Sequence, residues 1–166
     1  MAIIKPNNNT LSGITALPTG LGGKVLQVQS TQGINEFSSN SSSFVDVTGL
    51  SLTITPSATS SKILLLCNVN TYQATINSYF AIRWERAISG GATTGLGHGT
   101  YGLSFARSAV ANDFWAGVGM TYLDAPSTTS EITYQVQVSN TSGTTNFQIS
   151  VNSTSTSNIM ALEIAG

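Results

Sequence analysis

Apolar and polar residues alternate with a period of two over most of the chain from Lys24 onward, and this period predicts β-strands. The alternation is cleanest where Ile132, Tyr134, Val136 and Val138 are separated by one Thr and two Gln residues. Polar or Gly-containing loops separate the segments, so about eight antiparallel strands are expected. The segments with this pattern are 24–30, 44–48, 51–55, 62–72, 79–89, 114–123, 132–139, 147–152 and 160–164.

Two of these segments carry further information about the core. Residues 63–67 (ILLLC) are apolar on both faces, which is typical of a central strand covered on both sides. In the last segment, Met160, Leu162 and Ile164 form an apolar face opposite Ala161 and Glu163. Only 103–111 is a candidate for a short helical turn. The pattern therefore predicts an all-β antiparallel sandwich in residues 23–166, although a closed barrel would fit the same alternation.

Residues 1–22 show no such periodicity. Two prolines, a run of three asparagines and several glycines disfavour both helix and strand. We expect an extended N-terminal arm that anchors the domain to a partner surface, and the alternative is an arm folded back on its own domain. The apolar residues available for anchoring are Ile3, Ile4, Leu11, Ile14, Leu17 and Leu21.

The composition changes the picture through its lack of charge. Asp, Glu, Lys and Arg make up 8% of the 166 residues, against about 25% in ordinary soluble domains. The formal net charge is −1 and the mean hydropathy is +0.13. Ser, Thr, Asn and Gln bind water but do not repel another molecule. We therefore expect much of the surface to be buried against other copies or other subunits.

Several classes of protein are disfavoured. The six Lys and Arg residues are scattered, so no nucleic-acid-binding surface is expected. No apolar run reaches the ~18–20 residues of a membrane span, and no apolar segment of a signal peptide follows Lys5. The one cysteine, Cys67, lies in the apolar run and is expected in the core.

No constellation for catalysis, cofactor binding or metal binding emerges, so the chain is not expected to be an enzyme. The single histidine, His98, has no ligand or nucleophile near it and fits an exposed loop. Residues 97–102 match G-x-G-x-x-G, but no helix is predicted after them, as a dinucleotide site requires. The acids are dispersed singly. The cluster Arg83, Glu85 and Arg86 is compatible with ion pairs or with a solvated group.

Aromatic residues near the Gly-rich segment 90–102 suggest a binding surface, because ring faces beside polar side chains can bind sugars. The alternative is packing in the core or at a subunit interface. The residues selected for a receptor-binding surface are His98, Tyr101, Trp115 and Asp124.

Four stretches resemble a domain widespread in tailed bacteriophages, especially marine and cyanobacterial ones, that is identified as tail-fibre-like or otherwise as a virion structural protein. They are SSSFVDVTGLSLTITPSATSSKILLLCNVN, IRWERAIS, YLDAPSTTSEITYQVQVS and TSNIMALEIAG. The opening NNNTLSGITALPTGLGGKVLQV is similar to the start of such proteins, so the resemblance covers nearly the whole chain.

The resemblance implies a β-sandwich of jelly-roll type that forms a homotrimer on the virus particle after assembly in the host cytoplasm. The expected function is a short tail fibre or fibre head, attached to other virion proteins by its arm and contacting a glycan or protein of the host surface. Because only a short arm precedes the domain, a capsid decoration (cement) protein is the alternative. A free carbohydrate-binding module is a third.

Overall fold

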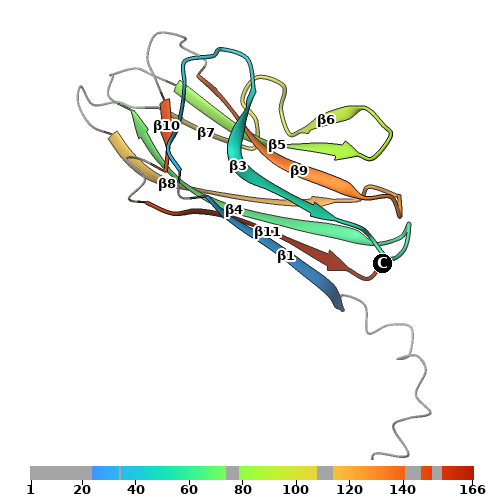
Figure 1. The fold of residues 1–166 in the computed structure, drawn as a ribbon. Helices are drawn as coiled ribbons and strands as arrows, with labels where there is room; N and C mark the ends of the chain where they lie inside the picture. The colour runs from blue at the N-terminus through green and yellow to red at the C-terminus, as the bar shows by residue number, and fades with distance from the viewer. Residues whose placement is uncertain (1–23, 34, 74–78, 108–113, 141–146, 151–154) are drawn as a thin grey trace, which may run out of the picture.

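The computed structural model describes residues 24–33, 35–73, 79–107, 114–140, 147–150 and 155–166, so the predicted arm of residues 1–22 lies outside the described residues. Two antiparallel sheets pack face to face (Figure 1). Sheet A contains β1 (Val25–Gly33), β2 (Phe37–Ser39), β4 (Lys62–Gln73), β8 (Phe114–Asp124), β10 (Phe147–Ile149) and β11 (Ser157–Ile164). Sheet B contains β3 (Val45–Ile54), β5 (Tyr79–Ile88), β6 (Thr93–Leu96), β7 (Ser104–Arg107) and β9 (Ile132–Asn140).

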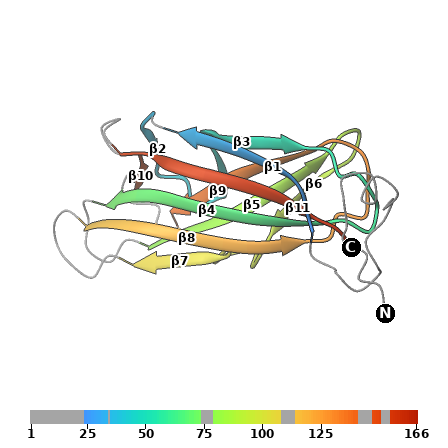
Figure 2. The ribbon, with the colours of Figure 1, turned by 90° about the horizontal axis from the view of Figure 1, so that it is seen from below.

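Strand β4 is the centre of sheet A. It pairs with β8 along its length on one side, and with β11 and then β10 on the other. Strand β1 flanks β11, and β2 flanks β10. Figure 2 shows β1, β11, β4 and β8 side by side in one layer. The predicted sandwich is therefore confirmed.

The strand order is that of a jelly roll. Three pairs of segments, β1 with β2, β6 with β7, and β10 with β11, each occupy one strand position, so the eleven described segments fill eight positions. The first position pairs with the eighth, the second with the seventh, the third with the sixth and the fourth with the fifth. This is the arrangement of one long antiparallel hairpin rolled into two sheets.

The core between the sheets contains the side chains that the alternation in β5 and β9 predicts. Phe80 stacks on Phe147 with ring centroids 4.5 Å apart, and Trp84 meets the edge of Tyr134 at 6.5 Å. All four rings are fully buried. Aromatic pairs at such distances contribute about 0.5–1.5 kcal/mol beyond the area they bury.

The structure shows which face of β11 is buried. Ile159, Ala161 and Glu163 face the core, whereas Met160 and Leu162 point outward. In β4, Ile63, Leu65 and Cys67 are buried, but Leu64 and Leu66 on the other face remain partly exposed. The apolar run of β4 is thus covered by the core on one side only.

Two local features differ from what the alternation alone suggests. Residues 104–107 of the candidate helical turn form strand β7, which pairs with β5. In β1, a register shift between Val25 and Gln27 turns Gln27 inward opposite Glu163, while Val28 lies opposite Leu162. Period two alone cannot predict a bulge of this kind.

Candidate functional site

The loop between β6 and β7 contains two of the predicted site residues, His98 and Tyr101, and its backbone forms a tight turn. Gly97 and Gly102 have φ of 110° and 62°, which L side chains rarely adopt. The backbone of His98 exchanges hydrogen bonds with Gly102, 3.0 Å and 2.8 Å long. A Cβ on Gly102 would also collide with the carbonyl of Ile82. The G-x-G-x-x-G match is therefore a tight turn between strands, without the helix of a dinucleotide site.

His98 orders this turn. Its Nδ1 accepts hydrogen bonds from the backbone N–H groups of Thr100 and Tyr101, both 3.1 Å long. Its ring stacks on Tyr101 with centroids 5.3 Å apart and planes inclined by 19°. The loop therefore presents a fixed pair of rings.

The stacked rings continue across the sheet edge. Tyr101 meets Phe105 edge-on at 5.0 Å, Phe105 stacks on Tyr79 at 5.7 Å, and the guanidinium of Arg107 lies 5.1 Å from the Tyr79 ring. A groove of about 420 Å³ runs beside Tyr79, Thr100, Tyr101 and Phe105. Exposed rings held in fixed positions can bind a ligand with little loss of entropy.

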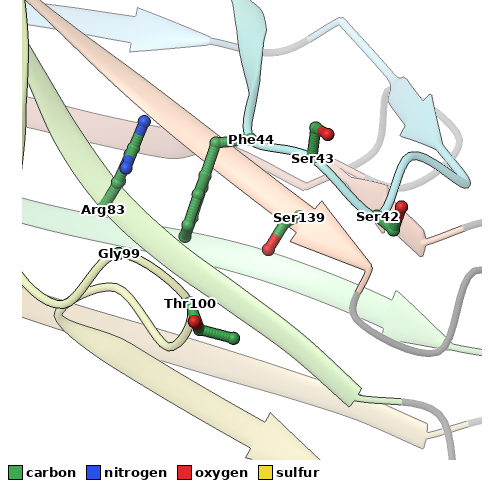
Figure 3. Close-up of a pocket in the computed structure, with 7 residues that line it drawn as sticks. All are labelled: Ser42, Ser43, Phe44, Arg83, Gly99, Thr100 and Ser139. Carbon is green, nitrogen blue, oxygen red and sulfur yellow. The ribbon is translucent and has the colours of Figure 1, made fainter.

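A polar groove of about 430 Å³ adjoins it, and Thr100 lines both. Figure 3 shows the guanidinium of Arg83 beside the ring of Phe44, and the two are 4.0 Å apart. Nε of Arg83 donates to Gln137 Oε1 over 2.9 Å. The remaining lining residues are Ser42, Ser43, Gly99 and Ser139. The two grooves together form a surface of rings, hydroxyl groups and one guanidinium, which we call the loop surface.

The four predicted receptor residues do not lie together. His98 and Tyr101 form part of the loop surface, whereas Trp115 lies on β8 in sheet A, with its ring 4.9 Å from Tyr72. Asp124 is only 4% exposed, so it cannot form an exposed contact as predicted. It pairs with Arg86 Nη1 at 2.8 Å and accepts a hydrogen bond from the Tyr134 hydroxyl at 2.6 Å.

These contacts give Asp124 a structural role, and Arg86 of the basic cluster makes an ion pair within the chain. Burial raises the pKa of Tyr134, and the hydrogen bond to Asp124 raises it further. Tyr134 therefore stays protonated and acts as the donor to the carboxylate.

Glu163 is a second buried carboxylate, and no pattern in the sequence indicates its partners. Glu163 and Asp124 are the register partners of Ile63 on its two sides, so both carboxylates lie at the same end of the core. Its Oε1 accepts from Ser57 N and from the hydroxyls of Ser57 and Ser61, and its Oε2 accepts from Gln27 Nε2, all within 2.7 Å.

Burial alone would raise the pKa of Glu163. The hydrogen bonds from Ser57, Ser61 and Gln27 outweigh burial and lower the pKa from 4.5 to about 2. A carboxylate held ionised in this way stabilises the corner that contains Pro56 and is not available for catalysis.

The other candidate groups show no arrangement for chemistry. Cys67 is buried as predicted, and burial raises the pKa of its thiol to about 12. Within the described residues, no group of three His, Cys, Asp or Glu side chains could hold a metal ion. Among the same residues, there is no helix with the length and apolarity needed to span a membrane.

The outer face of sheet A carries an apolar surface that the sequence did not reveal. Val28, Leu162, Leu64 and Leu123 are register partners in one row across β1, β11, β4 and β8. Val28 and Leu123 are 51% and 54% exposed. Met160 and Leu66 lie in the next row, and Val25 and Ile164 lie on the opposite side of the first row. We call this set the apolar row.

No protein-family model and no curated protein matches the chain. Among solved structures, the chain is similar to one of the infectious bursal disease virus Gx strain, at 15% identity and a TM-score of 0.46 over 86% of this chain. It is also similar to a mutant VP2 protein of the same virus in T=1 particles, at 10% identity and a TM-score of 0.42 over 82% of this chain. The chain spans about a third of the length of these proteins, 33% and 36% respectively.

Proposed function

We propose that the chain is a non-enzymatic structural protein of a phage particle, a homotrimeric short tail fibre or fibre head that contacts the host surface. The resemblance of its turn-and-strand stretches to the phage domain supports the virion role. The observation that supports association into a trimer is the apolar row. Four neighbouring strands expose aliphatic side chains on the face that turns away from the core.

The size of this apolar surface favours a protein partner. Burying an exposed Leu or Val side chain completely contributes about 1.5–3 kcal/mol, and these side chains, already partly buried, would each add part of this on assembly. A chain with so few charges has little to oppose self-association. In the proposed trimer, the apolar row of each copy packs against its neighbours.

The position of the chain ends supports an arrangement in which one end of the domain attaches to the particle and the other faces outward. Ala165 N donates to Lys24 O over 2.9 Å, so the described chain begins and ends at the same end of the sandwich (Figure 1). Ile88, the last residue of β5, pairs with Ile132 at the end of the sandwich where the described chain begins and ends. Tyr79, the first residue of β5, therefore lies at the opposite end. Residues 1–22 would anchor the domain at one end, and the loop surface would face the host at the other.

Adsorption inhibition tests this function. Purified protein should compete with the phage for host cells, and the double variant Tyr101→Ala, Phe105→Ala should lose most of this inhibition because it removes two rings of the loop surface. Thr53→Ala, an exposed position on the outer face of sheet B, is the matched control and should inhibit normally.

Wild-type protein that neither binds host cells nor inhibits adsorption would contradict the fibre role. Particles that lack the protein, adsorb normally and burst more readily on heating would identify a capsid decoration protein instead. Release of reducing sugar ends from host polysaccharide would contradict the non-enzymatic role.

A further inference from the structure

A small hollow lies on the outer face of sheet A, at the end of the strands that is distant from Lys24 and Gly166. Its volume is about 200 Å³. Pockets for drug-sized ligands usually occupy about 300–1,000 Å³, so this hollow fits a ligand of about one ring. It is lined by Asn70, Thr71, Trp115, Ala116, Gly117 and Ser155.

Gly117 forms the floor of the hollow and leaves room for hydrogen bonds. A Cβ placed on Gly117 would lie 3.8 Å from Asn68 Oδ1 and 3.9 Å from Asn70 Oδ1. Two amide oxygens therefore converge above a residue without a side chain. Glycine inside a strand often marks a place where a ligand approaches the backbone closely.

The orientation of the Asn70 amide is fixed by its other contact. Nδ2 of Asn70 donates to Thr156 O over 2.7 Å, and a carbonyl can only accept. Oδ1 consequently points toward the floor. The Oγ of Ser155, which also lines the hollow, is buried and has no hydrogen-bond partner within the described residues.

Trp115 forms the wall. Its side chain is 55% exposed, and Tyr72 supports it from the neighbouring strand at 4.9 Å. A broad ring face next to hydrogen-bond acceptors matches a sugar, which has C–H groups on one face and hydroxyl donors at its rim. No lining residue carries a charge. This favours a neutral sugar over an acidic one.

We propose that this hollow binds one neutral pyranose ring, which stacks on Trp115 and donates hydroxyl hydrogens to Asn68 and Asn70. The biological role of the site, recognition of a host glycan, rests on the proposed function. Binding itself does not. The site borders the apolar row on the same face of β4, because Leu66 and Asn68 are two residues apart, or about 7 Å in an extended strand.

The two tryptophans allow a direct test on the full-length protein. Trp84 is fully buried and Trp115 is exposed, so iodide should quench only the fluorescence of Trp115. Methyl glycosides of glucose, galactose and mannose are added at about 1–100 mM, the range expected for a one-ring ligand. At least one of them should protect Trp115 from iodide in a saturable way.

Two glycine variants sharpen the test. Gly117→Ala fills the floor without a contact closer than 3.8 Å, so it should fold normally and weaken binding by about tenfold. Gly119→Ala, two residues further along β8, is the matched control and also has its nearest contact at 3.8 Å. It should bind like the wild type. Calorimetric titration of Trp115→Ala should show no sugar binding.

The proposal is overturned if no glycoside protects Trp115, or if Gly117→Ala binds as tightly as the wild type. It is also overturned if iodide cannot reach Trp115 without sugar, because the ring would then be covered in the assembly. Sugar binding without adsorption inhibition would contradict only the host-contact function. Inhibition without sugar binding would contradict only this site.

Discussion

The outer faces of the two sheets are built in opposite ways. On sheet B, the Gln137 amide donates to Asp46 over 2.8 Å and accepts from Arg83 over 2.9 Å, so this row of register partners is linked by its own hydrogen bonds. On sheet A, the corresponding surface is the apolar row, whose members have no polar group to offer to water. The polar row on sheet B is linked within the chain, whereas the apolar row on sheet A would be covered by a partner in the proposed trimer.

The strands β9 and β11 show how this difference arises. In β9, Ile132, Tyr134 and Val136 face the core and polar residues face outward. In β11, the larger aliphatic residues face outward and a buried carboxylate faces the core. The larger apolar side chains of β11 therefore lie on the outer face of sheet A. Hydrogen bonds from Ser57 and Ser61 stabilise the carboxylate of Glu163, which faces the core.

The largest effect is expected from a charge in the apolar row. Leu64→Arg should convert the proposed trimer into monomers in sedimentation velocity at micromolar concentration, because an unpaired charge buried at an interface costs about 3–5 kcal/mol. Thr133→Arg makes the same type of change on the outer face of sheet B and should leave the assembly unchanged. A trimeric Leu64→Arg variant would show that the apolar row is not the interface.

A smaller effect is expected inside sheet A. Glu163→Gln should lower the free energy of unfolding by about 3 kcal/mol, since the amide nitrogen that replaces one carboxylate oxygen cannot accept a hydrogen bond and the neutral amide oxygen accepts the others more weakly. Urea unfolding in the Leu64→Arg background would measure it without a contribution from assembly. The control Glu36→Gln, at an exposed carboxylate, should change the free energy by less than about 1 kcal/mol. Equal effects at both positions would refute the structural role of Glu163.

The pH dependence follows from the same carboxylate. The pKa of Glu163 is lower in the folded chain than its ordinary value of 4.5, so its contribution to stability is complete above about 4.5. It should be lost as the pH falls from there toward about 2, where the folded form also takes up a proton. The difference in unfolding free energy between the wild type and Glu163→Gln should shrink across this range. A constant difference would point to packing rather than charge.

The smallest effect is expected on the outer face of sheet B. Gln137→Ala removes a bridging amide and should cost about 1 kcal/mol, because Asp46 and Arg83 can both turn to water. Thermal unfolding of the variant, compared with Thr53→Ala, would measure this cost. An altered trimer in Gln137→Ala would show that sheet B also takes part in assembly.

The fold could be predicted from the sequence where alternation and burial agree. The inward faces of β5 and β9 follow from Phe80, Trp84, Tyr134 and Val136, and the number of strand positions follows from the loops. Alternation identifies two faces but does not say which one is buried. In β11 both faces carry aliphatic residues, and the choice depends on Ser57 and Ser61, which are over 100 residues from Glu163.

The candidate site was harder to predict, because it depends on neighbours that only the folded chain brings together. His98 and Tyr101 are close in sequence, and their stacking could be expected. Asp124 follows the predicted strand 114–123 and is therefore expected in a turn, but it ends β8 beside Arg86 and Tyr134. The hollow beside Trp115 needs Asn68 and Asn70 from another strand, and the signal for it was the pair of glycines in β8.

The burial of Cys67 has a practical consequence for chemistry on the intact protein. A thiol with a pKa of about 12, packed inside the sandwich, has almost no thiolate at neutral pH and should not react with alkylating reagents. The chain thus behaves as a cysteine-free background without any mutation. A cysteine introduced at an exposed position of sheet B such as Thr53 would be the sole point of attachment for a dye, a spin label or a cross-linker.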